Sequence, residues 1–370
     1  MKINGNSMRN SRRPAAVILL LAAALGSCSK EPAEPFAPET YIGFGLPAVS
    51  MSGPEISDMD TRGTIYNAFP DGESFGVLGY LKSNDANAAA NWATKYLLLR
   101  PDVFDRRVVT YQDGACSYAG LEPWRDERSE TANLYTFFAY YPSDAFTIES
   151  SNADGAGAPL LTYTMPFSGN NLSLDSHTAV DAMVAVKYDH TKVMGNVDFT
   201  FSHLMTAIRF KVNNYDGSTP LRINSISLAG NFYRSTTLDY TPVAQSNNLK
   251  RTTSGTYNGT YSVYNDSNNP FTVAAGTSLF VGEGEGSIIL LLPGIDSGNS
   301  SVRGLGPDVS FSCEYIFMND FAQNGGGSLD YSFEPGTLYT INLNFIGDSF
   351  TINITSDNWE NGSDNDIIIQ

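Results

Sequence analysis

Few side chains in this sequence stand at the spacing that catalysis or metal binding requires. The three histidines, His177, His190 and His203, have no carboxylate or cysteine at metal-ligand spacing. His203 falls in an alternating apolar segment, where we expect a hydrogen-bonded core residue. No Ser–His–Asp arrangement and no Cys-x-x-Cys pair is indicated. The sequence therefore predicts no catalytic residues, no metal site and no cofactor. The remaining candidate residues are ones that other proteins would modify or cut.

The best-placed reactive residue is Cys28, which ends an N-terminal export pattern. A basic region is followed by an apolar run, Ala15–Leu25, that is too short to span a membrane. The small residues Gly26 and Ser27 then precede the cysteine. This order resembles the lipobox of bacterial lipoproteins, where a peptidase cuts before the cysteine and a diacylglyceryl group is joined to its sulfur. We predict a signal peptide over residues 1–27 and lipid on Cys28; an ordinary secretory signal with an incidental cysteine is the alternative.

The linker after Cys28 is rich in proline and glutamate, which keeps it extended and solvated. A short acidic stretch at this place resembles the surface-export signal of lipoproteins in some Gram-negative anaerobes. The chain is acidic as a whole, and loss of the four basic residues of the signal takes its net charge from −17 to −21. Such a charge repels nucleic acid, so we expect no nucleic-acid partner.

Residues 28–62 also contain a candidate strand. Tyr41–Leu46 alternates large apolar residues with glycine and is closed by Pro47, which predicts one short strand with a buried face. From Ala48 to Asp60 we expect a loop. The apolar side chains of the strand are those of Tyr41, Ile42, Phe44 and Leu46.

Arg62 and Gly63 follow that loop in the sequence Asp-Thr-Arg-Gly. An arginine in a polar segment flanked by glycine is where a trypsin-like protease reaches and binds an extended backbone. On these residues alone, a solvated surface arginine is the simpler interpretation.

Two further cysteines, Cys116 and Cys313, lie far from the export signal. An oxidising compartment would permit a disulfide between them. They are almost two hundred residues apart, so we favour two separate thiols.

The rest of the sequence favours strands over helices, because Tyr, Phe, Thr, Ser, Asn and Gly are plentiful and charged residues are sparse. We predict an all-β protein of two β-sandwich domains, residues 63–190 and 191–370, with a polar linker at Tyr188–Gly195. The length also allows one large β domain. A short helix is expected at Asp85–Ala93. The predicted strands are Ser74–Tyr80, Tyr96–Pro101, Arg107–Tyr111, Leu134–Pro142, Leu161–Pro166 at an edge, Ala179–Val186, Val197–Val212, Leu221–Leu228, Ser287–Leu292, Ser310–Ile316, Thr337–Phe345 and Phe350–Ile354.

Several short segments occur in a set order along nearly the whole chain. They are the lipobox at Cys28, Thr61–Gly63, Phe137–Pro142, Asp181–Ala185, Phe199–Leu204, Glu334–Tyr339 and Trp359–Gly362. In this order they resemble the fimbrillin family, the type V pilins of Gram-negative anaerobes. The resemblance implies two transthyretin-like β-sandwich domains and export to the cell surface as a lipoprotein. It also implies that an arginine-specific protease removes an N-terminal strand and that a strand of another subunit fills the open groove.

Carried over to this sequence, the resemblance makes Tyr41–Leu46 the removable strand and Arg62–Gly63 the cleavage site. The implied partners are other fimbrial subunits, an arginine-specific protease and the outer membrane, reached through lipid on Cys28. The strand-like tail Asp366–Gln370 is short for a donor strand, so a stalk position and a tip or accessory position both stay open. The alternative is a stand-alone surface lipoprotein that acts as an adhesin or binds glycan, with aromatic side chains such as Trp92 or Trp124 stacking on sugars.

Overall fold

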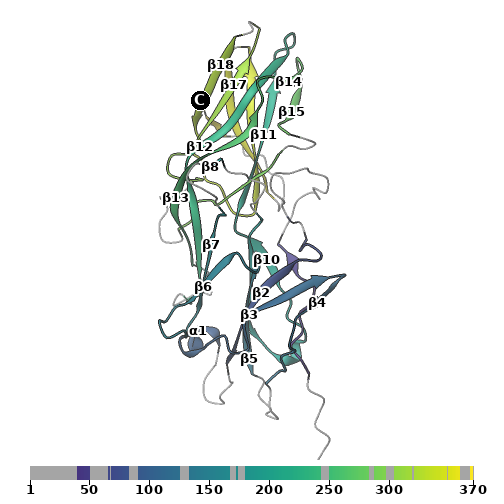
Figure 1. Ribbon diagram of the computed structural model, residues 1–370, viewed down its shortest axis with the longest axis vertical. Coiled ribbons are helices and arrows are strands. Elements are labelled where there is room, and N and C mark those ends of the chain that lie inside the picture. Colours follow the sequence, from purple (N-terminus) through teal and green to yellow (C-terminus); the bar gives the residue numbers. More distant parts are fainter. Residues whose placement is uncertain are drawn as a thin grey trace, which may run out of the picture. The chain divides into compact units, whose positions relative to one another are not determined.

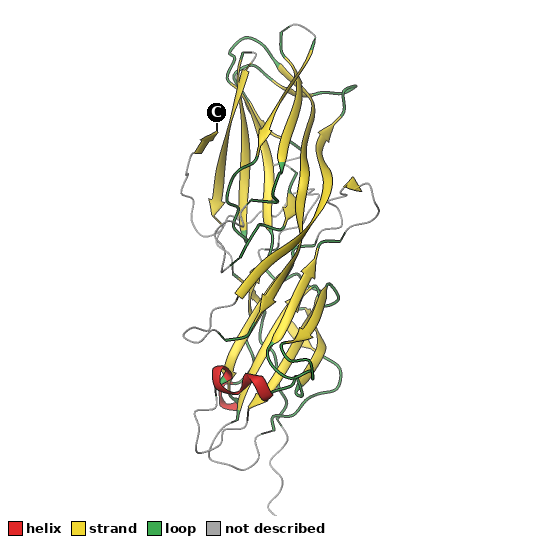
Figure 2. Cartoon of the chain, turned by 90° about the vertical axis from the view of Figure 1, so that its left-hand side faces the viewer, coloured by secondary structure: helices red, strands yellow, loops and turns green. Residues whose placement is uncertain are grey.

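The fold is known from a computed structural model. It describes residues 40–50, 66, 68–82, 91–125, 133–166, 172–173, 180–242, 250–282, 287–296, 304–318, 321–347, 349–358 and 367–369. The chain divides by its internal contacts into two units, Met1–Glu39 and Thr40–Gln370, and every described residue belongs to the second unit. Cys28, Arg62 and Gly63 lie outside the described residues. The described residues are nearly all strand and loop, as Figure 2 shows, and the predicted all-β class is confirmed.

The first sheet is built around β5, the most aromatic segment of the chain. Seven strands pair in the order β1-β10-β9-β5-β2-β3-β4. Figure 1 labels β2, β3, β4, β5 and β10 of this sheet. The bounds of the seven strands are β1 Ala48–Val49, β2 Ser74–Lys82, β3 Phe104–Gln112, β4 Ala115–Ser117, β5 Leu134–Tyr141, β9 Met183–His190 and β10 Thr200–His203.

Two further sheets contain the remaining strands. One runs β15-β11-β19-β20-β21, with β16 also on β11. The other runs β18-β17-β12-β13-β8, with β14 and β7 on β12 and β6 on β7. The bounds are β6 Phe146–Ser150, β7 Pro159–Thr164, β8 Leu172–Ser173, β11 Thr206–Asn214, β12 Leu221–Asp239, β13 Lys250–Asn265, β14 Phe271–Val273, β15 Ser278–Phe280, β16 Ile289–Leu291, β17 Ser310–Ile316, β18 Ala322–Ser328, β19 Thr337–Ile346, β20 Ser349–Asn358 and β21 Ile367–Ile369.

The central strands β2 and β5 of the first sheet are buried on both faces, which explains why β5 is rich in aromatic residues on both of its faces. Side chains of a strand alternate between faces. Phe137 and Tyr141 accordingly point into one core, while Phe138 and Tyr140 point into a second core that also holds residues of β7 and β12. A third core lies between β11 and β19 on one side and β12 and β17 on the other.

Strand pairing crosses the predicted domain boundary. β7, from residues 63–190, pairs with β12, and β10, from residues 191–370, pairs with β9. The predicted edge position of Leu161–Pro166 is wrong, because β7 has β6 on one side and β12 on the other. The division into two domains at this boundary remains a prediction.

The helix and the strand predicted near residue 95 are corrected by the structure. The α-helix α1 spans Trp92–Lys95, and a 3₁₀ helix follows at Tyr96–Leu98, where a strand was expected. The side chain of Asn91 caps α1 by accepting a hydrogen bond from the Thr94 N–H at 3.0 Å. Because Trp92 is buried in the second core, tertiary packing holds this turn. Of the expected helix Asp85–Ala93, only its last residues fall among those described.

Two predicted boundaries also shift. The linker expected at Tyr188–Gly195 begins inside β9, because His190 is buried and pairs with Tyr135 of β5. The single strand expected at Val197–Val212 divides into β10 and β11, which join different sheets.

Lys82, at the end of β2, makes stability depend on pH. Its side chain is fully buried and forms an ion pair with Asp189, and burial lowers the pKa of Lys82 to about 7 from 10.5. The folded state therefore releases a proton that the unfolded state keeps between these two values. Stability should rise as the pH increases from 7 toward 10, and the full cost of burying the charge is present below pH 7.

We expect the free energy of unfolding to rise by about 2 kcal/mol between pH 7 and pH 9, measured relative to a Lys82→Met variant that cannot titrate. Urea unfolding of both proteins across this range checks the result. Parallel pH profiles for the two proteins would contradict it.

Candidate functional site

The predicted removable strand lies along the residues around Val197, just before β10, at one edge of the first sheet. The N–H of Gly45 donates to the Val197 carbonyl at 3.1 Å, and the Val197 N–H donates to the Gly43 carbonyl at 2.8 Å. Further along, the N–H groups of Ala48 and Ser50 donate to carbonyls of the same neighbour at 2.9 and 2.7 Å. The loop expected from Ala48 is therefore wrong at its start, because β1 continues the same parallel pairing.

The opposite side of this segment contacts the residues that follow β4. β4 is the strand at the other edge of the first sheet. The Ile42 N–H donates to the Glu122 carbonyl at 2.8 Å, and the Trp124 N–H donates to the Thr40 carbonyl at 3.0 Å. Two side chains add to these bonds. The hydroxyl of Tyr118 donates to the Ile42 carbonyl at 2.6 Å, and the thiol of Cys116 donates to the Gly45 carbonyl at 3.3 Å. Residues 40–50 therefore close the gap between the two ends of the first sheet.

Two of the four predicted apolar anchors are buried. Ile42 and Phe44 are 1% and 6% exposed and belong to the first core, whereas Tyr41 and Leu46 are 44% and 62% exposed. Tyr41 points away because it alternates with Ile42.

Leu46 is exposed for a different reason: between two paired positions the segment has one residue more than the chain beside it. Phe44 is opposite Val197 and Ala48 is opposite Thr200, so the segment advances four residues while its neighbour advances three. The extra residue acts as a bulge and reverses the faces after it. Val49 packs against the core in place of Leu46.

Phe44 is the principal anchor and is surrounded by aromatic rings. Its ring stacks on that of Phe199, with centroids 5.8 Å apart and an angle of 18° between planes. Four other rings lie at centroid distances of 5.7–6.4 Å, within the range of favourable aromatic pairs. They belong to Phe75, Phe104, Tyr118 and Phe137. We call these five rings the aromatic socket.

The glycines between the anchors lie under polar side chains. A Cβ atom placed on Gly43 would meet Oδ1 of Asn196 at 2.5 Å, and one on Gly45 would overlap Oδ1 of Asp198. The alternation that predicted the strand therefore matches its two faces, with Ile42 and Phe44 toward the core and the glycines toward the polar side chains.

Both ends of segment 51–65, which carries Arg62, are fixed beside the end of β10. The hydroxyl of Ser50 donates to the Phe201 carbonyl at 2.9 Å. The N–H of Tyr66 donates to Oδ2 of Asp181 at 3.4 Å, and the same oxygen is hydrogen-bonded to Nδ1 of His203 at 2.7 Å. His203 is buried, which confirms the prediction of a hydrogen-bonded core histidine.

The remaining reactive groups offer no catalytic site among the described residues. Cys116 and Cys313 are both free, as predicted, and burial raises their pKa values to about 11 and about 12, so neither is a ready nucleophile. No group of three or more His, Cys, Asp or Glu residues in the described ranges is placed to hold a metal.

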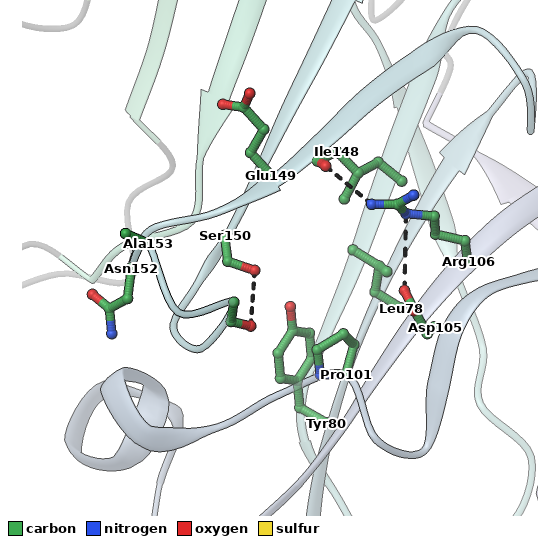
Figure 3. Close-up of a pocket in the computed structure, with 11 residues that line it drawn as sticks. Leu78, Tyr80, Pro101, Asp105, Arg106, Ile148, Glu149, Ser150, Asn152 and Ala153 are labelled. Atoms are coloured by element: carbon green, nitrogen blue, oxygen red, sulfur yellow. Dashed lines mark hydrogen bonds and ion pairs between the residues drawn. The ribbon is translucent and has the colours of Figure 1, made fainter.

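A hollow of about 380 Å³ lies between β2–β3 and β6 (Figure 3). Leu78, Tyr80 and Ile148 line it, and Arg106 on its rim donates to the Ile148 carbonyl at 3.2 Å. The hydroxyl of Ser150 is bonded to the Gly155 carbonyl at 3.1 Å, so the hollow holds no activated nucleophile.

Comparison with known proteins shows which family and which solved structures the chain is similar to. A family model described as fimbrillin-like matches residues 61–366. A fimbrium subunit of Phocaeicola vulgatus, Fim1C, is 24% identical over 208 residues, which cover 52% of this chain and 49% of that protein. The chain thus aligns with about half the length of this curated relative.

Similarity to a solved structure extends to the fold. A fimbrial protein from Bacteroides vulgatus is similar with a TM-score of 0.53 and 17% identity, over 77% of this chain and 92% of that one. A structure described as a putative cell adhesion protein from Bacteroides ovatus has a TM-score of 0.47 and 16% identity, over 87% and 99%.

Proposed function

The chain belongs to the fimbrillin-like family, and we propose that it is a fimbrial subunit that is assembled by replacement of its own strand, residues 40–50. An arginine-specific protease cuts after Arg62, and a strand of another subunit takes the place of the strand that is cut free. The observation that carries the proposal is the position of residues 40–50. Backbone bonds hold the segment on both sides, and two buried anchors fill the core behind it.

Loss of this segment would expose a strand edge and an apolar space to which another strand can bind. The backbone groups of Val197 and Phe199 would lose their partners, and the apolar space of Ile42 and Phe44 would be open to water. Unpaired strand edges bind other strands, and apolar pockets between them give specificity.

The proposed location is the outer membrane and the fimbria at the cell surface, reached as a lipoprotein. None of the helices in the described part of the chain is long and apolar enough to cross a membrane. Lipid on Cys28 would supply the attachment. A stalk position and a tip or accessory position both fit residues 40–50 as an acceptor site.

The residues named for sugar stacking give the alternative function little support. Trp92 and Trp124 are both buried in cores of the protein. A ring must present a face to solvent to stack on a sugar.

Lipid attachment is tested by replacing Cys28 with alanine. We expect the Cys28→Ala chain to lack incorporated palmitate and to keep its signal peptide, because the thiol is the acceptor and the peptidase acts on the lipidated form. Metabolic labelling followed by mass determination of the N-terminus measures both effects. Palmitate on the Cys28→Ala chain would show that the lipobox interpretation is wrong.

The proposal as a whole is tested by treating the purified precursor with an arginine-specific protease. The body of the protein should begin at Gly63 and form oligomers, alone or with partner subunits, as seen by N-terminal sequencing and light scattering. A protein cut at this site that still keeps residues 40–50 in the presence of partner subunits would contradict strand replacement.

A further inference from the structure

We propose that the aromatic socket selects the partner: the strand that replaces residues 40–50 must bring an aromatic side chain to the place of Phe44. This requirement rests on strand replacement as proposed above and adds the chemistry of the incoming strand. Phe44 makes one stacked contact, with Phe199, and three edge contacts, at 73–87° between planes. Its fifth neighbour, Phe104, is tilted by 43°.

The geometry of the socket favours a ring over an aliphatic side chain of similar volume. A ring offers a negative face and positive edges, and four of the five neighbours meet Phe44 in a stacked or edge-on arrangement that uses them. A branched aliphatic group has neither the flat shape nor the quadrupole, so it would leave gaps against Phe199 and lose contacts with the other rings.

The positions beside Phe44 set the rest of the pattern. Ile42 is buried in the same core, and Gly43 and Gly45 leave room for the side chains of Asn196 and Asp198. The partner strand is therefore expected to have the order large apolar, small, aromatic, small.

The strand β21 of this chain does not have that order. Ile367–Ile369 is a run of three isoleucines that pairs with β20, and it contains no ring and no small residue. We therefore expect that a second copy of this chain does not fill the site through this segment.

A peptide-exchange experiment tests the requirement. A recognition sequence for a site-specific protease is inserted between Ser50 and Tyr66 of the full chain, so that release does not depend on Arg62. After cutting, binding of fluorescent peptides is followed by anisotropy and by size exclusion. The peptides are residues 40–50 with Phe44, Leu or Ala at position 44, and residues 363–370.

The Phe44 peptide should replace the native strand. We expect the concentration for half-maximal exchange to rise roughly tenfold for the Leu peptide and at least about 100-fold for the Ala peptide. The peptide of residues 363–370 should not exchange. In a Tyr118→Leu chain, which lacks one ring of the socket at a half-buried position, the preference for Phe over Leu should shrink.

The outcomes separate the two proposals. Exchange of the Leu and Ala peptides within about threefold of the Phe44 peptide would overturn the aromatic requirement and leave strand replacement standing. Exchange of residues 363–370 as readily as the Phe44 peptide would do the same. If no peptide exchanges, the Phe44 peptide included, strand replacement itself is overturned, and the requirement falls with it.

Discussion

Replacement of Arg62 by alanine is expected to stop both cleavage and assembly. An arginine-specific protease needs the guanidinium group to bind its substrate, so the Arg62→Ala chain should stay uncut at this site. Residues 40–50 would then remain covalently attached and keep the acceptor site filled. We expect loss of essentially all protease-dependent oligomers, measured by electron microscopy and sedimentation. Efficient entry of Arg62→Ala into fibres would exclude strand removal at this site.

The matched control is Arg62→Lys, which keeps the positive charge. It should resist an arginine-specific protease in the same way, but a lysine-specific protease should cut it, and assembly should return. No lysine occurs elsewhere in residues 51–65, so the restored cut is assigned to position 62. If the cut Arg62→Lys chain still fails to assemble, cleavage is not the step that controls assembly.

Replacement of Phe44 by alanine should lower the free energy of unfolding of the uncut chain by about 3–5 kcal/mol, the usual cost of truncating a buried aromatic residue. The side chain is 6% exposed and contacts five rings, so the cavity has few ways to collapse. Urea unfolding measures the change, with Tyr41→Ala as the control, because Tyr41 lies in the same segment and is largely exposed.

The Tyr41→Ala change should stay within about 1 kcal/mol of the wild type. Equal effects of the two substitutions would mean that Phe44 does not anchor the segment. A Phe44→Ala chain should also release its strand sooner after cleavage.

The sequence predicted the parts of the fold that local pattern controls. β5 was predicted as a central buried strand because it is the most aromatic stretch of the chain, and both of its faces are indeed buried. The hairpin β19–β20 was predicted from its alternation and the turn at Gly347. The long strand β13 was missed, because its many Ser, Thr and Asn residues resemble a loop until β12 pairs along its whole length.

The candidate site, too, was predicted only where local pattern controls it. The alternation in Tyr41–Leu46 predicted four apolar anchors, of which Ile42 and Phe44 are buried. It could not show that Val49 packs against the core in place of Leu46, because the extra residue is recognised only when the segment is paired with its neighbour. Tyr118 and Cys116 were missed as partners of this segment, because more than seventy residues of chain separate each from its carbonyl acceptor.

The attachment of Ser50 and Tyr66 beside the same end of β10 gives the protease step a thermodynamic meaning. While the chain is intact, residues 40–50 stand next to their site at an effective concentration in roughly the millimolar range, so the strand returns whenever it leaves. Hydrolysis in residues 51–65 leaves the bonds of both ends in place and removes only this advantage of proximity. A strand that then departs is diluted and does not come back. In the proposed assembly, hydrolysis of one peptide bond would thus convert a reversible opening into an irreversible one, without any change in the contacts of the folded protein.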